Sequence, residues 1–226
     1  MFNGLDARLP ACLRELEQNN SREWFCAHRE EYQNRVTTPL TSLAELLAPN
    51  MAKLDGSLVK KLSRPQRDAR FVSNKPPYRT EAWFAFRRTL PNWTEYPAFF
   101  FEAAPEHCRW GMGYYSARPA TMAALRDIAR ENHQRFGQAM AMAASRGFTL
   151  QGELYKRPPG IPADTPEAIV DLMRRRNVYL CRIMDYGPLL LSDRLADVLA
   201  ADFAALGGMY RLFCRANERH TPVLPF

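Results

Sequence analysis

Apolar residues in the first part of the chain recur at the spacing of amphipathic helices. The first predicted helix carries its apolar residues on one face: Leu9, Cys12, Leu13 and Leu16. A second helix is predicted to begin at Ser21 or Asn20, residue types that cap helix starts, and to carry an aromatic stripe: Trp24, His28 and Tyr32. The helical pattern continues past Pro39, which bends or restarts it, and is predicted to end at Pro49.

The next segment, 49–80, has few periodic apolar residues and four prolines. We predict an extended connection with a short strand at 68–72. Three strands rich in aromatic residues are predicted after it, as an antiparallel meander: 82–87, 98–103 and 109–115. Gly111 and Gly113 lie in the last of these, where another backbone can approach closely.

Helical patterns return in the second half of the chain. Four helices are predicted: one from Pro119, one over 133–145 that stops at Gly147, one from Asp164, and one over 193–206 that Gly207 and Gly208 end. Strands are predicted at 148–150 and 178–183. Because helices and strands do not alternate strictly, the pattern predicts an α+β fold. We expect one domain over 1–226, with a mostly antiparallel sheet flanked by an N-terminal helical pair and several C-terminal helices.

Composition limits the class of protein. Hydrophobic residues make up 46% and charged residues 24% of the 226 residues, as in ordinary globular proteins. No apolar run reaches the 18 or so residues of a membrane span. The five cysteines are widely spaced and form no C-x-x-C pair, and we find no secretory leader. These features predict a cytoplasmic protein with free thiols and no membrane partner.

Positive charge is concentrated in one segment of the chain. Residues 60–88 hold nine Lys and Arg against two acidic residues, a balance of +7 that equals the net charge of the whole chain. Such a cluster favours an anionic partner, either a small molecule or a nucleic acid. The alternative is a solvated face with internal ion pairs.

The usual signatures of catalytic and cofactor sites are missing. The sequence has no G-x-S-x-G, G-x-x-x-x-G-K-S/T, H-E-x-x-H or G-x-G-x-x-G motif, and its four histidines are scattered. We therefore predict no metal and no cofactor. The second-helix histidine, His28, is interpreted as a packed or surface residue, with a role as a base as the alternative.

Chemistry-bearing residues gather between Arg64 and Tyr78. In an extended segment Asp68 and Arg70 share one face, which orients the carboxylate through a charge-assisted bond. The run Lys75–Tyr78 contains two prolines and favours polyproline II, which places the amine and the phenol on one side. A cation near a phenol lowers the pKa of the phenol.

These residues predict an anion pocket. Its expected ligand-binding residues, including a second basic loop, are Arg64, Arg67, Arg70, Asn74, Lys156 and Arg157. The expected catalytic residues are Asp68 as a base or charge stabiliser and Tyr78 or Lys75 as an acid. Transfer or hydrolysis without a metal fits these residue types better than redox chemistry.

The same run resembles the signature R-x-x-R-D-x-R-F, followed by D/N-K-x-x-Y, of a bacterial family catalogued as domain of unknown function 2461. The matching residues are Arg64, Arg67, Asp68, Arg70, Phe71, Asn74, Lys75 and Tyr78. Further similar stretches lie at 19–25, 110–113 and 152–158, so that the resemblance spans roughly residues 9–206. It supports the choice of site and implies no substrate, because the family has no assigned activity.

Three hypotheses on function follow. The first is a protein that binds a small phosphorylated or carboxylated ligand and acts on it without a metal. The second is a nucleic-acid-binding protein that uses 60–88 for phosphates and Trp83, Phe84 and Phe86 for base stacking. The third is an interaction scaffold in which the network of Arg64, Arg67, Asp68 and Arg70 is structural.

Overall fold

The computed structural model describes residues 2–68, 75–157 and 160–219. The chain has an α+β fold with an antiparallel sheet, as the sequence predicts. Within the described residues, the sheet has six strands in the order β1-β2-β3-β4-β6-β5. Their bounds are β1 Leu58–Leu62, β2 Ala82–Arg88, β3 Pro97–Ala103, β4 His107–Tyr114, β5 Thr149–Gln151 and β6 Tyr179–Asp185. The order confirms the predicted meander, because β2, β3 and β4 are neighbours.

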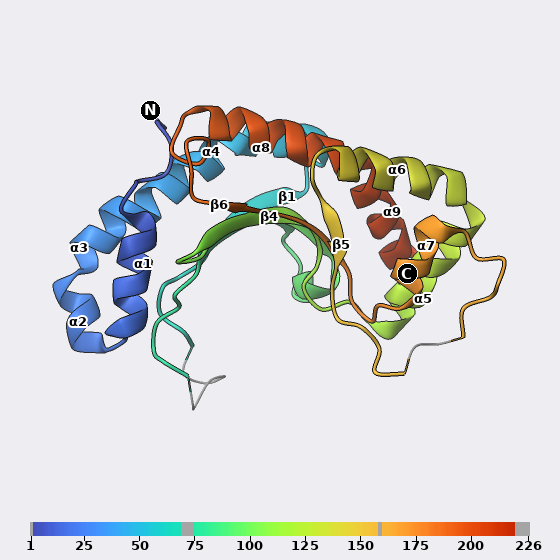
Figure 1. Ribbon diagram of the computed structural model, residues 1–226, viewed down its shortest axis with the longest axis horizontal. Helices are drawn as coiled ribbons and strands as arrows, with labels where there is room; N and C mark the ends of the chain where they lie inside the picture. The colour runs from blue at the N-terminus through green and yellow to red at the C-terminus, as the bar shows by residue number, and fades with distance from the viewer. Residues whose placement is uncertain (1, 69–74, 158–159, 220–226) are drawn as a thin grey trace, which may run out of the picture. The chain divides into compact units, whose positions relative to one another are not determined.

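Helices precede, interrupt and follow the strands (Figure 1). The N-terminal helices are α1 Leu9–Gln18, α2 Arg22–Ala27, α3 Arg29–Tyr32, a π-helical turn Gln33–Thr37 and α4 Thr38–Leu54. The others are a 3-10 turn Trp93–Glu95, α5 Pro119–Glu131, α6 His133–Ser145, α7 Glu167–Met173, α8 Arg194–Ala205 and α9 Gly207–Glu218. No helix within the described ranges is both long and apolar enough to cross a membrane.

The described residues group into two compact units. Unit 1 comprises those within Met1–Phe86, Phe100–Trp110 and Ile183–Ala200, and unit 2 comprises those within Arg87–Phe99, Gly111–Arg182 and Ala201–Phe226. Several elements, β2 among them, contribute residues to both units. The expectation of a single domain stays a prediction.

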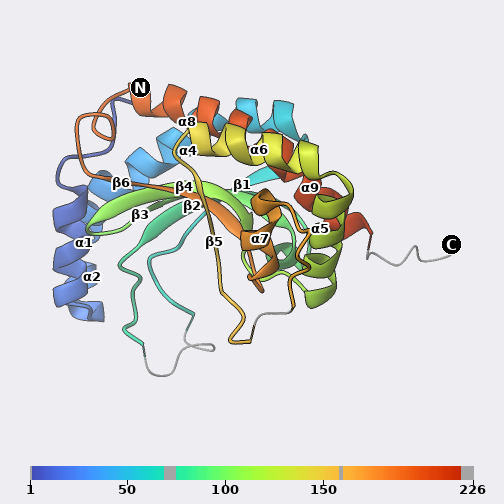
Figure 2. The same ribbon diagram turned by 45° about the vertical axis from the view of Figure 1, so that its right-hand side comes forward.

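Unit 1 has a core of leucines and aromatic residues. Phe84 and Phe101 stack with ring centroids 5.4 Å apart, and Trp110 stacks on Phe101 at 6.1 Å. All three rings are fully buried. Helices α1 and α2 of this unit lie side by side in both views (Figure 2).

Unit 2 has a core in which aromatic residues of the strands meet those of the C-terminal helices. Phe99 contacts Phe203 and Tyr210, and Tyr114 stacks on Phe213 at 4.9 Å. The buried Tyr114 hydroxyl donates to the Phe213 carbonyl at 2.8 Å, so the phenol is satisfied inside the core. Helices α5, α6, α7 and α9 pack against one another, as Figure 1 shows.

The start of the second helix is confirmed, but its course differs from the prediction. The Ser21 hydroxyl accepts a hydrogen bond from the Trp24 N–H at 3.2 Å and caps α2. The helix is interrupted at His28, whose ring stacks on Trp24 at 4.0 Å, and the π-helical turn Gln33–Thr37 follows. An extra residue in the turn rotates the helix face, so that Val36 is buried.

Helix and strand replace part of the predicted extended connection. Helix α4 continues through Pro49 to Leu54, and β1 follows at Leu58–Leu62. The proline removes one backbone donor, but Leu47 and Met51 on either side of it are buried at 1% and 2% exposure. Burial of this face outweighs the lost hydrogen bond.

One predicted helix start was wrong, and one helix was not predicted. The helix expected from Asp164 begins only at Glu167, after Pro166, and no side chain caps it. The helix predicted over 193–206 does end just before Gly207, because α8 stops at Ala205, but Gly207 and Gly208 also begin a further helix, α9, that was not predicted. The Cα of Gly208 packs near Ala139 of α6, where a Cβ would lie 3.6 Å away, so a small residue suits this helix crossing.

Gly111 and Gly113 of β4 lie where the sequence predicts a close backbone approach. A Cβ at Gly111 would overlap the carbonyl of Leu180 in β6, and a Cβ at Gly113 would overlap the Cα of Tyr179. Gly147, after α6, has φ +82° and forms the expected left-handed helix end.

Strand β1 lies at one end of the strand order. It carries two adjacent lysines, Lys60 and Lys61, both exposed. The amine of Lys60 lies 3.0 Å from the carboxylate of Glu45 on α4.

Candidate functional site

The predicted site lies on a hairpin in unit 1. Segments 63–68 and 75–79 are joined by an antiparallel bridge between Gln66 and Tyr78, and we call them the basic hairpin. The backbone N–H of Arg67 donates across to the second segment at 2.7 Å. The hairpin continues into β2, where the Ser63 N–H donates to the Trp83 carbonyl at 2.8 Å.

The basic hairpin is fastened to the N-terminal helices at Tyr78. The side-chain amide of Asn20, just before α2, accepts from the Tyr78 N–H at 2.9 Å and donates to the Tyr78 carbonyl at 3.0 Å. The Tyr78 ring stacks on Phe25 of α2, with centroids 4.1 Å apart, and is 6% exposed. Tyr78 therefore anchors the hairpin, and its role as an acid stays a prediction.

Arg67 is half-buried and engaged with its own hairpin. Its Nε donates to the Tyr78 carbonyl at 3.2 Å, and its guanidinium lies 3.9 Å from the Glu81 carboxylate. The structure thus brings together two predicted site residues, Arg67 and Tyr78, through a side chain and a backbone carbonyl.

Three other predicted residues of the hairpin are exposed: Arg64, Asp68 and Lys75. Within the part of the chain that the structure describes, neither Arg64 nor Lys75 forms a side-chain hydrogen bond or an ion pair. Arg70 and Asn74 lie outside the described residues, and so does the bond predicted between Asp68 and Arg70.

The second basic loop, with Lys156 and Arg157, belongs to unit 2. Tyr155 fixes its start, because its hydroxyl accepts from Arg126 at 3.2 Å and its N–H donates to the Arg174 carbonyl at 3.0 Å. Lys156 and Arg157 themselves are exposed. Their participation in the predicted pocket stays a prediction.

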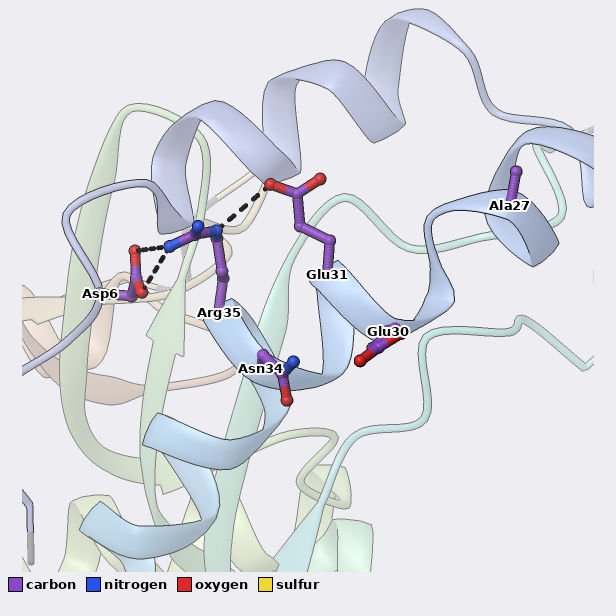
Figure 3. A pocket seen from close by; sticks show the side chains of 6 residues that line it. All are labelled: Asp6, Ala27, Glu30, Glu31, Asn34 and Arg35. Carbon is purple, nitrogen blue, oxygen red and sulfur yellow. Dashed lines mark hydrogen bonds and ion pairs between the residues drawn. The ribbon is translucent and has the colours of Figure 1, made fainter.

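A separate hollow of about 470 Å³ lies in unit 1, lined by Asp6, Ala27, Glu30, Glu31, Asn34 and Arg35 (Figure 3). Arg35 binds Asp6 at 3.0 Å and Glu31 at 3.2 Å, and Asp6 raises the pKa of the guanidinium. Its lining carries three carboxylates against one guanidinium, so the hollow does not suit an anion. None of the predicted site residues lines it.

A metal site is not evident in residues 2–68, 75–157 and 160–219. No three or more His, Cys, Asp or Glu side chains gather there in a way that could hold a metal ion. The chemistry that the basic hairpin offers is that of fixed cations and hydrogen-bond donors.

A comparison with models of protein families identifies the family of the chain. The family model DUF2461, described as a conserved hypothetical protein, matches residues 10–211, most of the sequence. The chain belongs to the DUF2461 family. No curated protein matches this DUF2461 member. Since the family description names no activity, function is inferred from the site. That the signature residues of the basic hairpin mark the family stays a prediction.

Two residues of this DUF2461 site were missed as site residues in the sequence. Asn20 and Phe25 hold the hairpin, although the sequence indicated only a helix cap at Asn20 and no site role for Phe25. Both lie in the stretch 19–25 that resembles the family, which was the available signal. The contact of Asn20 with Tyr78 joins positions 58 residues apart. Phe25 is also far from Tyr78 along the chain, so neither contact has a local pattern.

Proposed function

We propose that this DUF2461 protein binds a small phosphorylated or carboxylated molecule on the exposed side of the basic hairpin. The observation that carries the proposal is the pair of exposed cations, Arg64 and Lys75, that make no ion pair within the described residues. Their neighbours are engaged: Lys60 with Glu45 and Arg67 with Glu81.

The hairpin suits an anion because its backbone is held before the ligand arrives. Asn20 and Phe25 fix Tyr78, and Arg67 ties the two segments together. A preordered site loses less conformational entropy on binding. A guanidinium offers a two-pronged donor to phosphate or carboxylate, and an ammonium adds a point charge. Arg64 and Lys75 supply one of each.

The chemistry proposed for the bound ligand is transfer or hydrolysis without a metal. Asp68, exposed on the same hairpin, is the base or charge stabiliser. Lys75 is the acid that the exposed surface favours, because the Tyr78 ring is buried against Phe25.

The nucleic-acid hypothesis for segment 60–88 loses two of its three predicted stacking residues. Phe84 and Phe86 are buried at 0% and 1% exposure and belong to the core of unit 1. Bases therefore cannot stack on these two rings, whereas stacking on half-buried Trp83 and the phosphate contacts of that hypothesis stay a prediction.

The test is the melting temperature at low salt against anions free of aromatic rings, which we call ring-free anions: ribose 5-phosphate, glycerol phosphate, citrate and inorganic phosphate. A ligand at about 100 times its Kd stabilises by about 2.7 kcal/mol, which raises the Tm of a chain this long by about 5–10 °C. The double variant Arg64→Gln with Lys75→Gln is expected to lose the shift.

The control removes the same charges elsewhere. Lys53 and Arg211 are exposed and form no side-chain contact within the described residues, so Lys53→Gln with Arg211→Gln should keep the shift. No shift with any ring-free anion, or an equal loss in both double variants, contradicts the proposal. In that case the arginines of the hairpin are structural.

A further inference from the structure

A second exposed surface in unit 2 combines aromatic rings with arginines. Tyr115, directly after β4, has 77% of its surface exposed. The nearest ring is that of half-buried Trp93, with centroids 6.1 Å apart and an interplanar angle of 40°. The guanidinium of Arg87 lies 4.5 Å above the Trp93 ring. We call Arg87, Trp93, Tyr115 and Arg118 the aromatic platform.

The aromatic platform carries a positive balance. Arg118, whose side chain is 61% exposed, binds the Glu95 carboxylate at 2.7 Å. Hydrogen bonds from Arg118 and Asn92 lower the pKa of Glu95, so this carboxylate is charged at neutral pH. Two guanidiniums against one carboxylate leave one net positive charge beside the rings.

Backbone and side-chain hydrogen bonds hold the two loops of the platform in place. The Ser116 N–H donates to the Thr94 carbonyl at 2.8 Å, which joins the Tyr115 loop to the Trp93 turn. The Asn177 amide donates to the Tyr115 carbonyl at 3.3 Å. The Asn217 amide donates to the Glu95 carbonyl at 2.9 Å. The exposed ring thus sits on a preordered base, which lowers the entropic cost of binding.

We propose that the aromatic platform binds a nucleobase that carries phosphate, by stacking the base on Tyr115 and placing the phosphate near the arginines. Every base has a π-face, and single-stranded nucleic acids and nucleotides are bound by such rings together with cations. The net positive charge favours a ligand with an anionic group over a neutral sugar or a proline-rich peptide, which could accept hydrogen bonds from Arg87 and Arg118 but would form no charge pair with them. This site shares no residue with the basic hairpin.

The test separates stacking from charge. Binding at low salt is measured by fluorescence anisotropy with a labelled short single strand and with an abasic strand of equal length and charge. Competition with AMP and with ribose 5-phosphate makes the same comparison for a free nucleotide. Binding of the strand alone assigns the site to nucleic acid, and competition by AMP extends it to mononucleotides.

Variants at Tyr115 report on the ring itself. Tyr115→Ala is expected to weaken binding of the strand about 5-fold to 150-fold, the effect of losing one base stack, whereas Tyr115→Phe keeps it. Leu154→Ala is the control, because Leu154 is also exposed, at 55%, in unit 2 and lies outside the platform. Both Tyr115 variants should keep the wild-type Tm because the side chain is exposed.

The proposal is overturned if the abasic strand binds as tightly as the strand with bases, if neither the strand nor AMP binds, or if Tyr115→Ala binds like wild type. The double variant at Arg64 and Lys75 should bind the strand as wild type does. If the protein binds no ring-free anion but still binds the strand with bases, only the proposed function is contradicted. If it binds ring-free anions but shows no preference for bases, only the proposal on the aromatic platform is contradicted.

Discussion

A single amide side chain couples the basic hairpin to the N-terminal helices. Asn20 uses both its oxygen and its nitrogen on the backbone of Tyr78. Asn20→Ala removes both bonds and leaves the partly buried Tyr78 N–H without its partner, while the Tyr78 carbonyl keeps only the bond from Arg67 Nε; we expect this change to lower the free energy of unfolding by about 2 kcal/mol. Urea unfolding followed by circular dichroism measures this change.

The control for Asn20→Ala is Gln18→Ala, because Gln18 is exposed at the end of α1. Its stability should stay within about 0.5 kcal/mol of wild type. If Asn20→Ala also keeps wild-type stability, the amide does not hold the hairpin.

Gly113 marks a place where a single methyl group cannot be added. A Cβ there would overlap the backbone of Tyr179 on the neighbouring strand β6. Gly113→Ala should therefore lower the free energy of unfolding by about 3 kcal/mol, at the upper end of overpacking effects. Gly160→Ala is the matched change, since a Cβ at Gly160 meets nothing within 4 Å. Thermal unfolding should shift strongly for the first variant only, and equal melting temperatures would refute the close approach.

At the scale of elements, a buried carboxylate ties three segments of unit 2 together. Asp202 of α8 has a fully buried side chain, and it binds Arg146 after α6 at 2.7 Å and Arg182 of β6 at 3.1 Å. Asp202→Asn removes the negative charge, so that Arg146 and Arg182 lose their ion pairs with this side chain. Breaking a buried ion pair in this way costs about 3 kcal/mol or more.

Chemical denaturation measures the cost for Asp202→Asn against Asp197→Asn on the same helix. Asp197 is exposed, so its variant should unfold at the wild-type denaturant concentration. An Asp202→Asn protein as stable as the control would mean that the two arginines are satisfied without the carboxylate.

Local sequence patterns predicted correctly the helix ends that depend on neighbouring residues. They failed at the helix ends that depend on burial against other parts of the fold. The cap at Ser21 and the left-handed end at Gly147 depend on nearby backbone groups, and both were predicted. Pro49 and Gly207 are residue types that break helices. Helix α4 nevertheless continues through Pro49, and α9 begins at Gly207, because the apolar faces of both helices are buried. Packing of this kind cannot be inferred from propensity.

The candidate site was predictable as a segment but not as a geometry. Charge clustering and the motif pointed to Arg64, Arg67 and Lys75, which lie on one hairpin. The sequence could not show that Tyr78 is buried, because its partner Phe25 lies far away along the chain. The sequence did not indicate the aromatic platform for the same reason, because strands β3 and β4 separate Trp93 and Tyr115 along the chain.

At the scale of the whole molecule, thiol reactivity should report the burial of the cysteines. Cys26 is exposed, whereas Cys12, Cys108, Cys181 and Cys214 are buried, and these five described cysteines form no disulfide. Burial raises the pKa of Cys12 to about 11 and that of Cys108 to about 12. These two thiols therefore stay protonated and unreactive at pH 8.

Titration with dithiobisnitrobenzoate at pH 8 should release one equivalent rapidly from the folded protein and five after unfolding in guanidinium. Cys26→Ser should abolish the rapid phase. Rapid release of more than one equivalent would show that the buried thiols are accessible in the folded state.

The lysines of β1 bear on how separate molecules behave toward each other. A strand at the end of a sheet offers unpaired backbone groups to a second chain, and lysines there oppose such pairing. Lys60 and Lys61 would face like charges in a second copy, and the net charge of +7 adds to the repulsion. Since salt shortens the range of this repulsion to a few ångströms at about 1 M, we expect the protein to stay dispersed in dilute buffer and to self-associate first in concentrated salt.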